Sequence, residues 1–218
     1  MKKYILILMT GLLAAVSCSL EDVYQRTNVD DILMYYEGKL CNDYGTVYTV
    51  TGNEAAGNWK QEGKRFYTVF DILNRNFDIT IKELHEFENI TSTPTEEEKP
   101  ELGDPVQLIV GTVSGGFVNI LFRTYSDKKS DYEQKVSFLH KFNGSELQLF
   151  MVFDGNHENP AEKDVENLES KEHYVCIPIF HHDVKITSLS FKVNELKQTG
   201  ASEFTAEETV YPFTFSVN

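Results

Sequence analysis

The feature that most constrains the fold is a succession of short runs in which apolar and polar residues alternate between turn-forming residues. Phe77, Ile79 and Ile81 are separated by polar residues, which is the period-two pattern of a half-buried strand. Residues 104–113 and 117–125 flank a Ser-Gly-Gly turn and predict a β-hairpin. Because such runs recur along the chain, the sequence predicts an all-β protein.

The first group of runs predicts a small barrel over residues 32–92. The strands expected here are 32–41, 46–51, 63–73, 77–84 and a fifth within 84–90. The residues Asn42, Asp43 and Gly45 supply the turn of the first hairpin. So few short strands cannot bury two sheets, whereas a curled barrel closes their edges, so we expect a partly open, five-stranded, OB-like barrel.

The second group of runs predicts an immunoglobulin-like β-sandwich over residues 104–218. Residues 93–103, which contain three consecutive glutamates and two prolines, are expected to be an acidic linker between the two domains. About seven short strands in the second domain suit two packed sheets. An acidic stretch, 154–172, interrupts them and predicts a short helix within 162–168. The strands expected are 104–113, 117–125, 135–142, 147–153, 173–180, 185–193 and 209–217.

The amino terminus predicts a lipoprotein signal peptide over residues 1–17. Two lysines precede an apolar run, 4–16, that is too short to span a bilayer comfortably. The small residues Ala15 and Ser17 precede Cys18, whose thiol is the expected site of lipidation. Residues 18–31 are then a polar, lipid-anchored tether. The alternative is an ordinary secretory signal with an incidental cysteine.

The residues after Cys18 resemble a known export signal. Ser19, Leu20, Glu21 and Asp22 are similar to the acidic signal of surface lipoproteins in the Bacteroidetes. The resemblance implies an outer-membrane protein, with membrane lipid as a partner through acylated Cys18. It further implies display at the cell surface, with the periplasmic face as the alternative.

The charge of the chain excludes one class of partner. The formal net charge is −14 at pH 7, and residues 93–218 carry 21 of the 34 acidic residues. A strongly negative surface repels phosphate backbones and gains nothing from counterion release, so nucleic acid is excluded as a partner. Anionic membrane surfaces are disfavoured for the same reason.

Sequence signatures of catalysis are absent. The mature chain contains no Gly-x-Ser-x-Gly, His-Glu-x-x-His, Cys-x-x-Cys or Gly-x-Gly-x-x-Gly motif. Paired carboxylates such as Glu83 and Glu86 are expected to be surface charges. We therefore predict a protein that is not an enzyme and that has no catalytic residues and no cofactor.

Two groups of residues with metal-ligand chemistry also fall short of a site. His181, His182 and Asp183 are adjacent, but neighbouring residues of a strand point to opposite faces, and a transition-metal site needs three or four convergent ligands. Residues 154, 156 and 158 have the spacing of a calcium loop, but its sixth position, 159, lacks the glycine and its twelfth, 165, lacks the glutamate. We therefore expect no metal.

Aromatic residues in the first domain are the candidate binding residues. Tyr35, Tyr36 and Trp59 could fill the barrel interior, or could line the face that other OB-folds use for ligands. Trp59 is the strongest candidate for partner contact because it lies in a glycine-containing loop. Cys41 and Cys176 fit either a disulfide or two separate buried thiols, and their spacing does not decide between them.

Three parts of the chain resemble the NigD-like lipoproteins of the Bacteroidetes. These are the Cys18 segment with its acidic continuation, the run 76–87, and the hairpin 104–120, although Thr112-Val113 stands where the family often has tryptophan before the glycine turn. The resemblance implies an OB-like domain followed by a β-sandwich domain. It also implies bacteriocin immunity or another role in binding a protein partner, such as a toxin. A glycan-binding accessory protein of polysaccharide uptake is the alternative.

Overall fold

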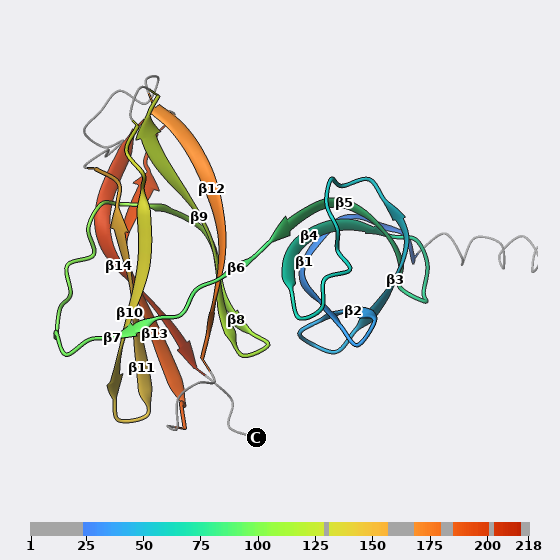
Figure 1. The fold of residues 1–218 in the computed structure, drawn as a ribbon, viewed down its shortest axis with the longest axis horizontal. Helices are drawn as coiled ribbons and strands as arrows, with labels where there is room; N and C mark the ends of the chain where they lie inside the picture. The colour runs from blue at the N-terminus through green and yellow to red at the C-terminus, as the bar shows by residue number, and fades with distance from the viewer. Residues whose placement is uncertain (1–23, 129–130, 157–167, 180–184, 201–202, 215–218) are drawn as a thin grey trace, which may run out of the picture. The chain divides into compact units, whose positions relative to one another are not determined.

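The computed structural model describes residues 24–128, 131–156, 168–179, 185–200 and 203–214. Within these ranges the chain forms strands and turns without any α-helix, so the predicted all-β class is confirmed. The strands form two compact units, the first ending at Phe87 and the second beginning at Glu88 (Figure 1). The predicted signal peptide and Cys18 lie outside the described residues. The described part contains no helix that is long and apolar enough to cross a membrane.

The first unit is a closed barrel of five strands. The order around the barrel is β1-β2-β3-β5-β4, and β1 closes it by pairing with β4. The β3–β5 pair is parallel, and the other four pairs are antiparallel. The strands are β1 (Arg26–Tyr36), β2 (Lys39–Asn42), β3 (Val47–Asn53), β4 (Arg65–Ile72) and β5 (Asp78–Glu86).

Bulges allow this short sheet to curl into a barrel. The register shifts once in each of the β1–β4, β3–β5 and β4–β5 pairs. A bulge bends its strand and increases the local twist, which helps a sheet to close on itself. Gly52 lies at the β3 bulge, where a Cβ atom would stand only 2.9 Å from the Thr80 hydroxyl. The bend therefore depends on a residue without a side chain.

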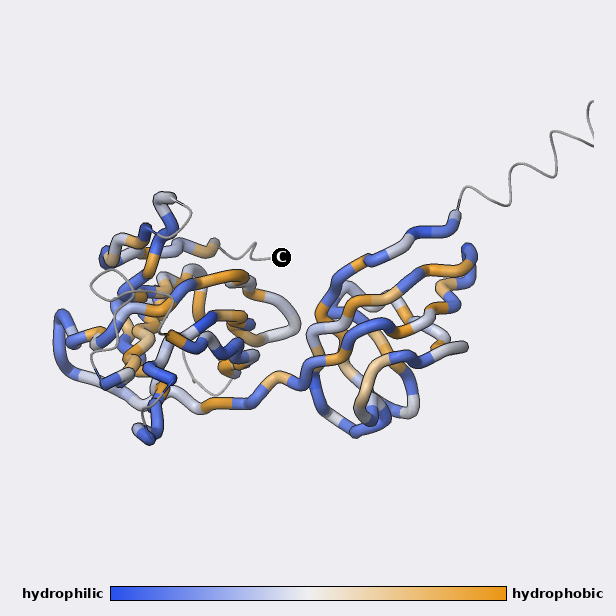
Figure 2. Tube along the Cα trace, turned by 90° about the horizontal axis from the view of Figure 1, so that it is seen from above, coloured by the Kyte–Doolittle hydropathy of each residue, from blue (hydrophilic) through white to orange (hydrophobic). Residues whose placement is uncertain are grey.

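The barrel interior is filled by alternate residues of its strands. Figure 2 shows hydrophobic and hydrophilic residues alternating along the strands of this unit. The side chains that point inward pack into one apolar cluster, which excludes water from the barrel. The buried members of this cluster are Leu33, Leu40, Tyr48, Phe70, Ile72, Ile79 and Ile81.

Two details of the predicted barrel are wrong. The fifth strand is β2, not a strand within 84–90, because β5 continues to Glu86 and the next two-residue strand, Glu88–Asn89, belongs to the second unit. Strand β1 begins at Arg26, inside the range 18–31 that was expected to be tether. The polar residues 26–31 can form a strand because they pair with β4 while staying largely exposed.

The second unit is a sandwich of two sheets. The five-stranded sheet has the order β14-β13-β11-β10-β7, and the four-stranded sheet has the order β6-β12-β9-β8. Both sheets contribute to one core cluster, with β9 and β12 facing β10, β11 and β13. The strands are β6 (Glu88–Asn89), β7 (Thr93–Pro94), β8 (Gln107–Ser114), β9 (Phe117–Asp127), β10 (Lys135–Asn143), β11 (Glu146–Asp154), β12 (Leu168–Pro178), β13 (Ser188–Gln198) and β14 (Phe204–Thr214).

The predicted hairpin of the second unit forms as expected. Strands β8 and β9 pair antiparallel up to Ser114 and Phe117. Gly115 and Gly116 join them with φ values of +56° and +81°. A two-residue hairpin turn favours positive φ at both positions, which glycine adopts without strain.

Residues 102–106, here called the bridging segment, hold two strands of the larger sheet together. Strands β11 and β13 pair directly only over Glu146–Phe150 and Ser188–Lys192. Beyond that point Phe153 of β11 exchanges backbone hydrogen bonds of 2.8 and 3.1 Å with the bridging segment. On its other side, Val106 bonds to Asn194 and Leu196 of β13 at 3.0 and 2.8 Å. The segment therefore satisfies backbone groups that the diverging strands leave open.

The bridging segment corrects the prediction that residues 93–103 are only a linker. Thr93 and Pro94 form β7, which pairs with β10, and Leu102 is buried. The sequence did not reveal that both ends of this stretch belong to the sandwich, because its acidic composition suggested an exposed linker. Only the glutamates between the two ends, Glu96, Glu97 and Glu98, are exposed as a linker would be. The predicted helix within 162–168 lies outside the described residues except for Leu168, which begins β12.

A substitution at Gly103 tests how closely the bridging segment must approach β11. Its φ is +74°, and a Cβ atom would lie 2.1 Å from the Phe153 carbonyl oxygen. Gly144 has a similar φ of +62° with no atom within 4 Å of its Cβ position. We expect Gly103→Ala to lower the free energy of unfolding by about 2–3 kcal/mol more than Gly144→Ala, because only the first adds a backbone clash. Calorimetric unfolding of both variants measures this difference, and equal losses would contradict the close approach.

Candidate partner-binding surface

Two of the three predicted binding aromatics, Tyr35 and Trp59, lie together against the barrel core. Their rings meet edge to face with centroids 5.6 Å apart, and both are half-buried. The Lys60 ammonium lies 4.9 Å from the centroid of the Trp59 ring, over a face on which a sugar could otherwise stack. The pair is therefore part of the barrel's packing, and its contact with a partner stays a prediction.

The third predicted residue, Tyr36, lies on the opposite face of β1. Adjacent residues of a strand point to opposite faces, so Tyr36 points outward where Tyr35 packs against the core. Its exposed fraction is 51%. The structure therefore separates Tyr36 from the Tyr35–Trp59 pair.

Tyr36 is one of five apolar residues on the outside of β1, β2, β3 and the turn between β2 and β3, which we call the outer patch and define as Met34, Tyr36, Cys41, Tyr44 and Val47. Tyr36 pairs with Lys39 at the start of β2, whereas Tyr44 follows the end of β2, so the two tyrosines lie at opposite ends of this strand. Met34 and Cys41, between them, are half-buried. The register places Met34 opposite Cys41 and Cys41 opposite Val47, so these three form a row across β1, β2 and β3. Val47 is 47% exposed and Tyr44, on the turn between β2 and β3, is 86% exposed. Exposed apolar residues gathered in this way often mark an interaction surface.

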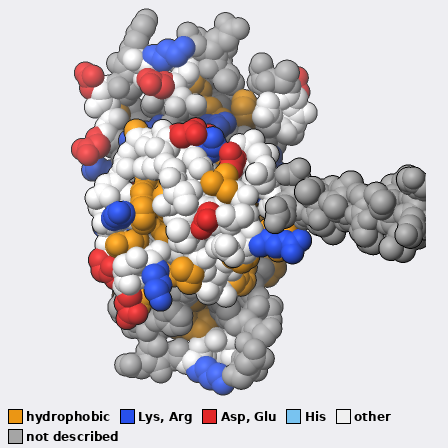
Figure 3. All heavy atoms as spheres, turned by 90° about the vertical axis from the view of Figure 1, so that its right-hand side faces the viewer, with side chains coloured by type: hydrophobic (Ala, Val, Ile, Leu, Met, Phe, Trp, Pro, Cys, Tyr) orange, Lys and Arg blue, Asp and Glu red, His pale blue; other side chains and the backbone are white. Residues whose placement is uncertain are grey.

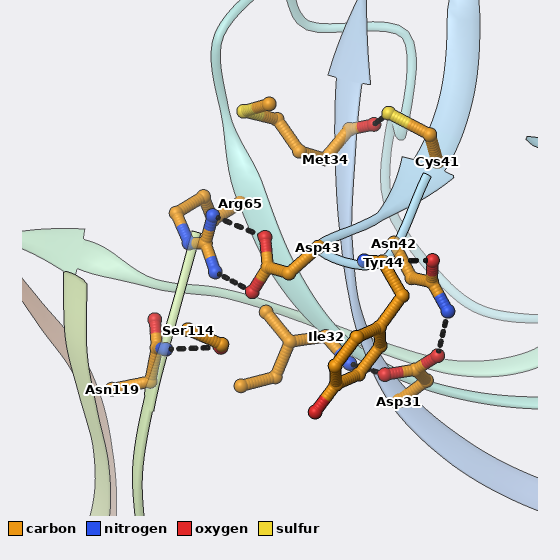
Figure 4. Close-up of polar contacts among 10 residues, drawn as sticks. All are labelled: Asp31, Ile32, Met34, Cys41, Asn42, Asp43, Tyr44, Arg65, Ser114 and Asn119. Atoms are coloured by element: carbon orange, nitrogen blue, oxygen red, sulfur yellow. Dashed lines mark hydrogen bonds and ion pairs between the residues drawn. The ribbon is translucent and has the colours of Figure 1, made fainter. Parts of the chain in front are cut away.

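The turn that carries Tyr44 is fixed by its own hydrogen bonds. The Asn42 side-chain oxygen accepts bonds from the backbone N–H groups of Tyr44 and Thr46, at 3.1 and 2.9 Å. The Asn42 side-chain nitrogen donates to Asp31 of β1 at 2.9 Å (Figure 4). Gly45 closes the turn with a φ of +84°, which suits glycine. Tyr44 is thus held on a rigid support.

A buried ion pair fastens the same turn to β4. The Arg65 guanidinium donates two parallel hydrogen bonds to the Asp43 carboxylate, at 2.9 and 2.6 Å (Figure 4). The two side chains are only 3% and 7% exposed. A bidentate pair of this kind restricts both partners geometrically as well as attracting them. Tyr44 therefore extends into solvent from a turn whose neighbouring residues are both tied to the barrel wall.

Tyr48 completes the polar group beneath this turn. Asn42 donates to its hydroxyl at 3.4 Å, and Asp31 lies close enough to act on its charge. Burial, with a smaller contribution from the negative charge of Asp31, raises the pKa of Tyr48 to about 12. The phenol therefore stays neutral at any physiological pH and serves as a structural group.

Sequence reasoning missed Tyr44 and Val47. The residues around Tyr44 were correctly interpreted as a turn, and a large aromatic side chain between Asp43 and Gly45 is a signal of exposure that was available. The burial of Asp43 could not be anticipated, because its partner Arg65 lies 22 positions away in the chain.

The two cysteines are separate in the structure. Cys41 lies in β2 and donates a weak hydrogen bond to the Met34 carbonyl at 3.6 Å, while Cys176 is buried in β12. No disulfide joins them. Of the two alternatives that their spacing left open, the structure therefore shows separate thiols.

The carboxylates and histidines that could act as acids, bases or metal ligands form no site in the described part of the chain. Glu83 and Glu86 are exposed and lie near His85 and Lys64, as surface ion pairs do. Asp154 accepts a hydrogen bond from Tyr132 at 2.6 Å. No cluster of three or more His, Cys, Asp or Glu suited to a metal occurs among the described residues. Residues 158 and 181–183 lie outside them.

Two surface hollows flank the bridging segment of the second unit. Their volumes are about 370 and 410 Å³, and Glu101 and Gly103 line both. The carboxylates at the second hollow have structural partners, since Asp104 accepts a hydrogen bond from the Gly155 backbone at 2.9 Å. Ser92 contacts His140 at 3.0 Å, but neither residue lines either of these two hollows. A nucleophile and base beside a cleft, which hydrolysis would need, are not assembled at these hollows.

Comparison with known proteins shows a shared fold. No protein-family model and no curated protein matches the sequence. Among solved structures, a protein of unknown function from Bacteroides vulgatus is 13% identical, with a TM-score of 0.58 over 88% of this chain and 92% of its own. A NigD-like immunity protein from Bacteroides caccae is 14% identical, with a TM-score of 0.55 over 87% of this chain and 98% of its own.

A third similar structure is a candidate lipoprotein from Bacteroides fragilis. It is 10% identical, with a TM-score of 0.56 over 88% of this chain and 99% of its own. At these identities the likeness concerns the fold. The resemblance to NigD-like proteins drawn from the sequence is confirmed at that level, because a NigD-like protein is among the structural neighbours.

The buried ion pair predicts a large difference between two charge-neutralising substitutions. We expect Asp43→Asn to lower the stability of the barrel by about 3 kcal/mol, because it leaves the buried Arg65 charge unpaired. Glu54→Gln, which removes the exposed partner of Lys82, should change stability by less than about 1 kcal/mol. Urea unfolding followed by Trp59 fluorescence measures both, since this is the single tryptophan of the chain. Similar losses in the two variants would show that the Asp43 pair is not buried.

The raised pKa of Tyr48 predicts a specific loss of stability in alkali. Its folded pKa of about 12 lies above the ordinary value of 10, so the neutral phenol stabilises the fold fully below pH 10. This contribution is lost as the pH rises from 10 towards 12. We expect the Tyr48→Phe barrel to lose less stability over this range than the parent, whereas exposed Tyr36→Phe should follow the parent. Urea unfolding at a series of pH values tests this, and identical curves for all three would refute it.

Proposed function

We propose that this chain is a non-enzymatic, lipid-anchored protein of the bacterial cell envelope that binds a protein partner through the outer patch. The anchor is the acylated thiol of Cys18, which follows small residues at positions 15 and 17 as a lipoprotein signal requires. The shared fold with a candidate lipoprotein from Bacteroides fragilis supports an envelope location. The outer membrane, with display at the cell surface, is the location we propose.

The observation that carries partner binding is the exposure of Tyr44 on a fixed turn. Binding costs least when the contact residues are already held in place, and this turn is held by Asn42 and by the Asp43–Arg65 pair. Tyrosine is enriched among the residues that dominate protein interfaces, because it offers a large apolar ring with a polar end. Val47 at the start of β3 adds exposed apolar surface after the same turn, and Tyr36 adds it at the other end of β2.

A toxin is the partner that we propose. The Bacteroides caccae neighbour is named a NigD-like immunity protein, which favours a toxin among the possible protein partners. An anchored protein with a rigid apolar patch could hold such a toxin at the envelope before it reaches its target. The role requires no catalytic residue.

The test is a toxin-sensitivity assay in a deletion strain carrying different versions of the gene. We expect the deletion to increase sensitivity and the parental gene to restore protection. Tyr44→Ser should restore little, with binding weakened at least tenfold, and Cys18→Ser should fail because the protein is no longer anchored. A matched pair of valines provides the surface control: Val47→Ser should reduce protection, whereas Val210→Ser in the second unit should not, although the two valines are 47% and 49% exposed.

Two outcomes would contradict the proposal. Equal sensitivity of the deletion strain and its parent to every toxin tested would remove the immunity role. Full protection by Tyr44→Ser, at the same protein level as the parent, would remove the outer patch as the binding surface. The folding of each variant is checked by its unfolding curve, and an exposed substitution should change stability by about 0.5 kcal/mol or less.

A further inference from the structure

One end of the barrel differs in charge from the rest of this acidic chain. Residues 24–29 and 72–77 contain Arg26 and Arg75 and no aspartate or glutamate, although the whole chain has 34 acidic residues against 20 basic ones. These two segments come from the start of β1 and from the turn between β4 and β5. Two arginines therefore come from parts of the chain that are far apart in sequence, with Asp22, Asp30, Asp71 and Asp78 as the acids nearest to them in sequence.

The structure brings these two segments together. Arg26 pairs with Ile72 in the β1–β4 ladder, and the Arg75 guanidinium carbon lies 5.3 Å from the centroid of the Tyr24 ring. Tyr24 and Leu73 are 42% and 38% exposed. We call Tyr24, Arg26, Leu73 and Arg75 the anchor-side end. On the face shown in Figure 3, which includes the point where the described chain begins, basic and hydrophobic side chains lie close to each other.

The acids that flank this end are engaged in the barrel. Asp71 accepts a hydrogen bond from the Asn28 backbone at 2.9 Å and lies 3.4 Å from the Lys82 ammonium. Asp78 accepts a bond from the Asn74 side chain at 2.7 Å. Of these two acids, Asp71 is paired with a positive charge, and Asp78 is held by a hydrogen bond to a neutral amide. The anchor-side end places Arg26 and Arg75 beside Tyr24 and Leu73.

The position of this end along the chain identifies what covers it. Only six residue steps separate Cys18 from Tyr24. At 3.3–3.6 Å per residue, even a fully extended chain spans no more than about 20 Å over that distance. A lipid on Cys18 therefore keeps the anchor-side end within about 20 Å of the membrane surface, while the other end of β1, at Tyr36, lies ten residues further along the strand.

We propose that the barrel docks on the phospholipid surface through the anchor-side end. This inference rests on the lipid anchor of the proposed function. Arginine binds lipid phosphate groups, and tyrosine and leucine suit the boundary between headgroups and acyl chains. The net charge of −14 opposes docking by most other surfaces, so the two arginines of this end also set the orientation of the barrel. The outer patch residue Tyr36 is then held away from the lipid.

Depth-dependent fluorescence quenching tests the docking. The acylated protein is placed in vesicles of phosphatidylethanolamine and phosphatidylglycerol that contain lipids brominated near the headgroup. A Trp59→Phe background removes the single native tryptophan, and one new tryptophan is introduced by Leu73→Trp or, as the matched control, by Tyr36→Trp. Both replaced residues are exposed and belong to the same unit. We expect strong quenching for Leu73→Trp and little for Tyr36→Trp.

Charge reversal provides the second measurement. The double variant Arg26→Glu, Arg75→Glu is made in the Leu73→Trp protein. We expect the equilibrium constant for docking to fall about fivefold for each arginine replaced, and the docked fraction to fall with it. Replacing both by lysine should preserve most of the quenching, because the positive charge remains.

The outcomes separate docking from the function on which it rests. Equal quenching at both positions, or none at either, in protein whose mass shows an acylated Cys18 overturns docking and leaves anchoring intact. A mass that shows an unmodified Cys18 overturns the anchor and the docking together. Quenching unaffected by charge reversal overturns the role of the arginines. Toxin protection is measured separately, so its loss or retention is assigned to the outer patch.

Discussion

The buried pair between Asp43 and Arg65 is the interaction on which the barrel and its candidate surface both depend. Strand β2 has only four residues and pairs with β1 and β3 over short ladders. Such a strand contributes few backbone hydrogen bonds, so the turn that follows it needs another attachment. The bidentate pair provides it by tying the turn to β4, the strand that closes the barrel against β1. Because both charges are buried, neither can be removed without leaving the other unpaired.

In the sandwich, backbone hydrogen bonds rather than an ion pair hold together strands that pair over a short distance. Strands β11 and β13 diverge after pairing over five residues each, and residues 102–106 fill the opening with hydrogen bonds to both. This arrangement requires Gly103, where the backbone of the bridging segment meets the Phe153 carbonyl. In both units, residues outside the regular strands therefore tie together parts of the sheet that pair over only a short distance. Asp43 does so through an ion pair, and residues 102–106 do so through backbone hydrogen bonds.

The candidate functions follow from the side chains that remain exposed on this structure. The fixed turn holds Tyr44 in solvent, with exposed Val47 following it at the start of β3, which is the arrangement that the proposed binding surface needs. At the anchor-side end, the first residues of β1 meet the β4–β5 turn and gather two arginines. In the docking that we propose, a short tether and a barrel with chemically different ends together give the anchored protein a definite orientation.

Several features could be predicted from the sequence. The alternation around Ile79 and Ile81 predicts the buried face of β5, and both residues are fully buried. The Ser-Gly-Gly turn predicts the β8–β9 hairpin, because only positive-φ residues fit its centre. The segment around Cys18 also predicts processing and lipidation, since a peptidase recognises a local pattern, and this stays a prediction because Cys18 lies outside the described residues.

Other features depended on contacts between distant residues. Short-range patterns missed β2 as the fifth strand, because its four residues become a strand only when β1 and β3 pair on either side. They also missed the structural role of residues 102–106 and the burial of Asp43. Local sequence determines whether a segment can be a strand or a turn, since alternation and backbone preference act over a few residues. Which segments pair, and which side chains remain exposed, is decided by the tertiary structure, because burial and hydrogen-bond satisfaction are properties of the whole packed chain.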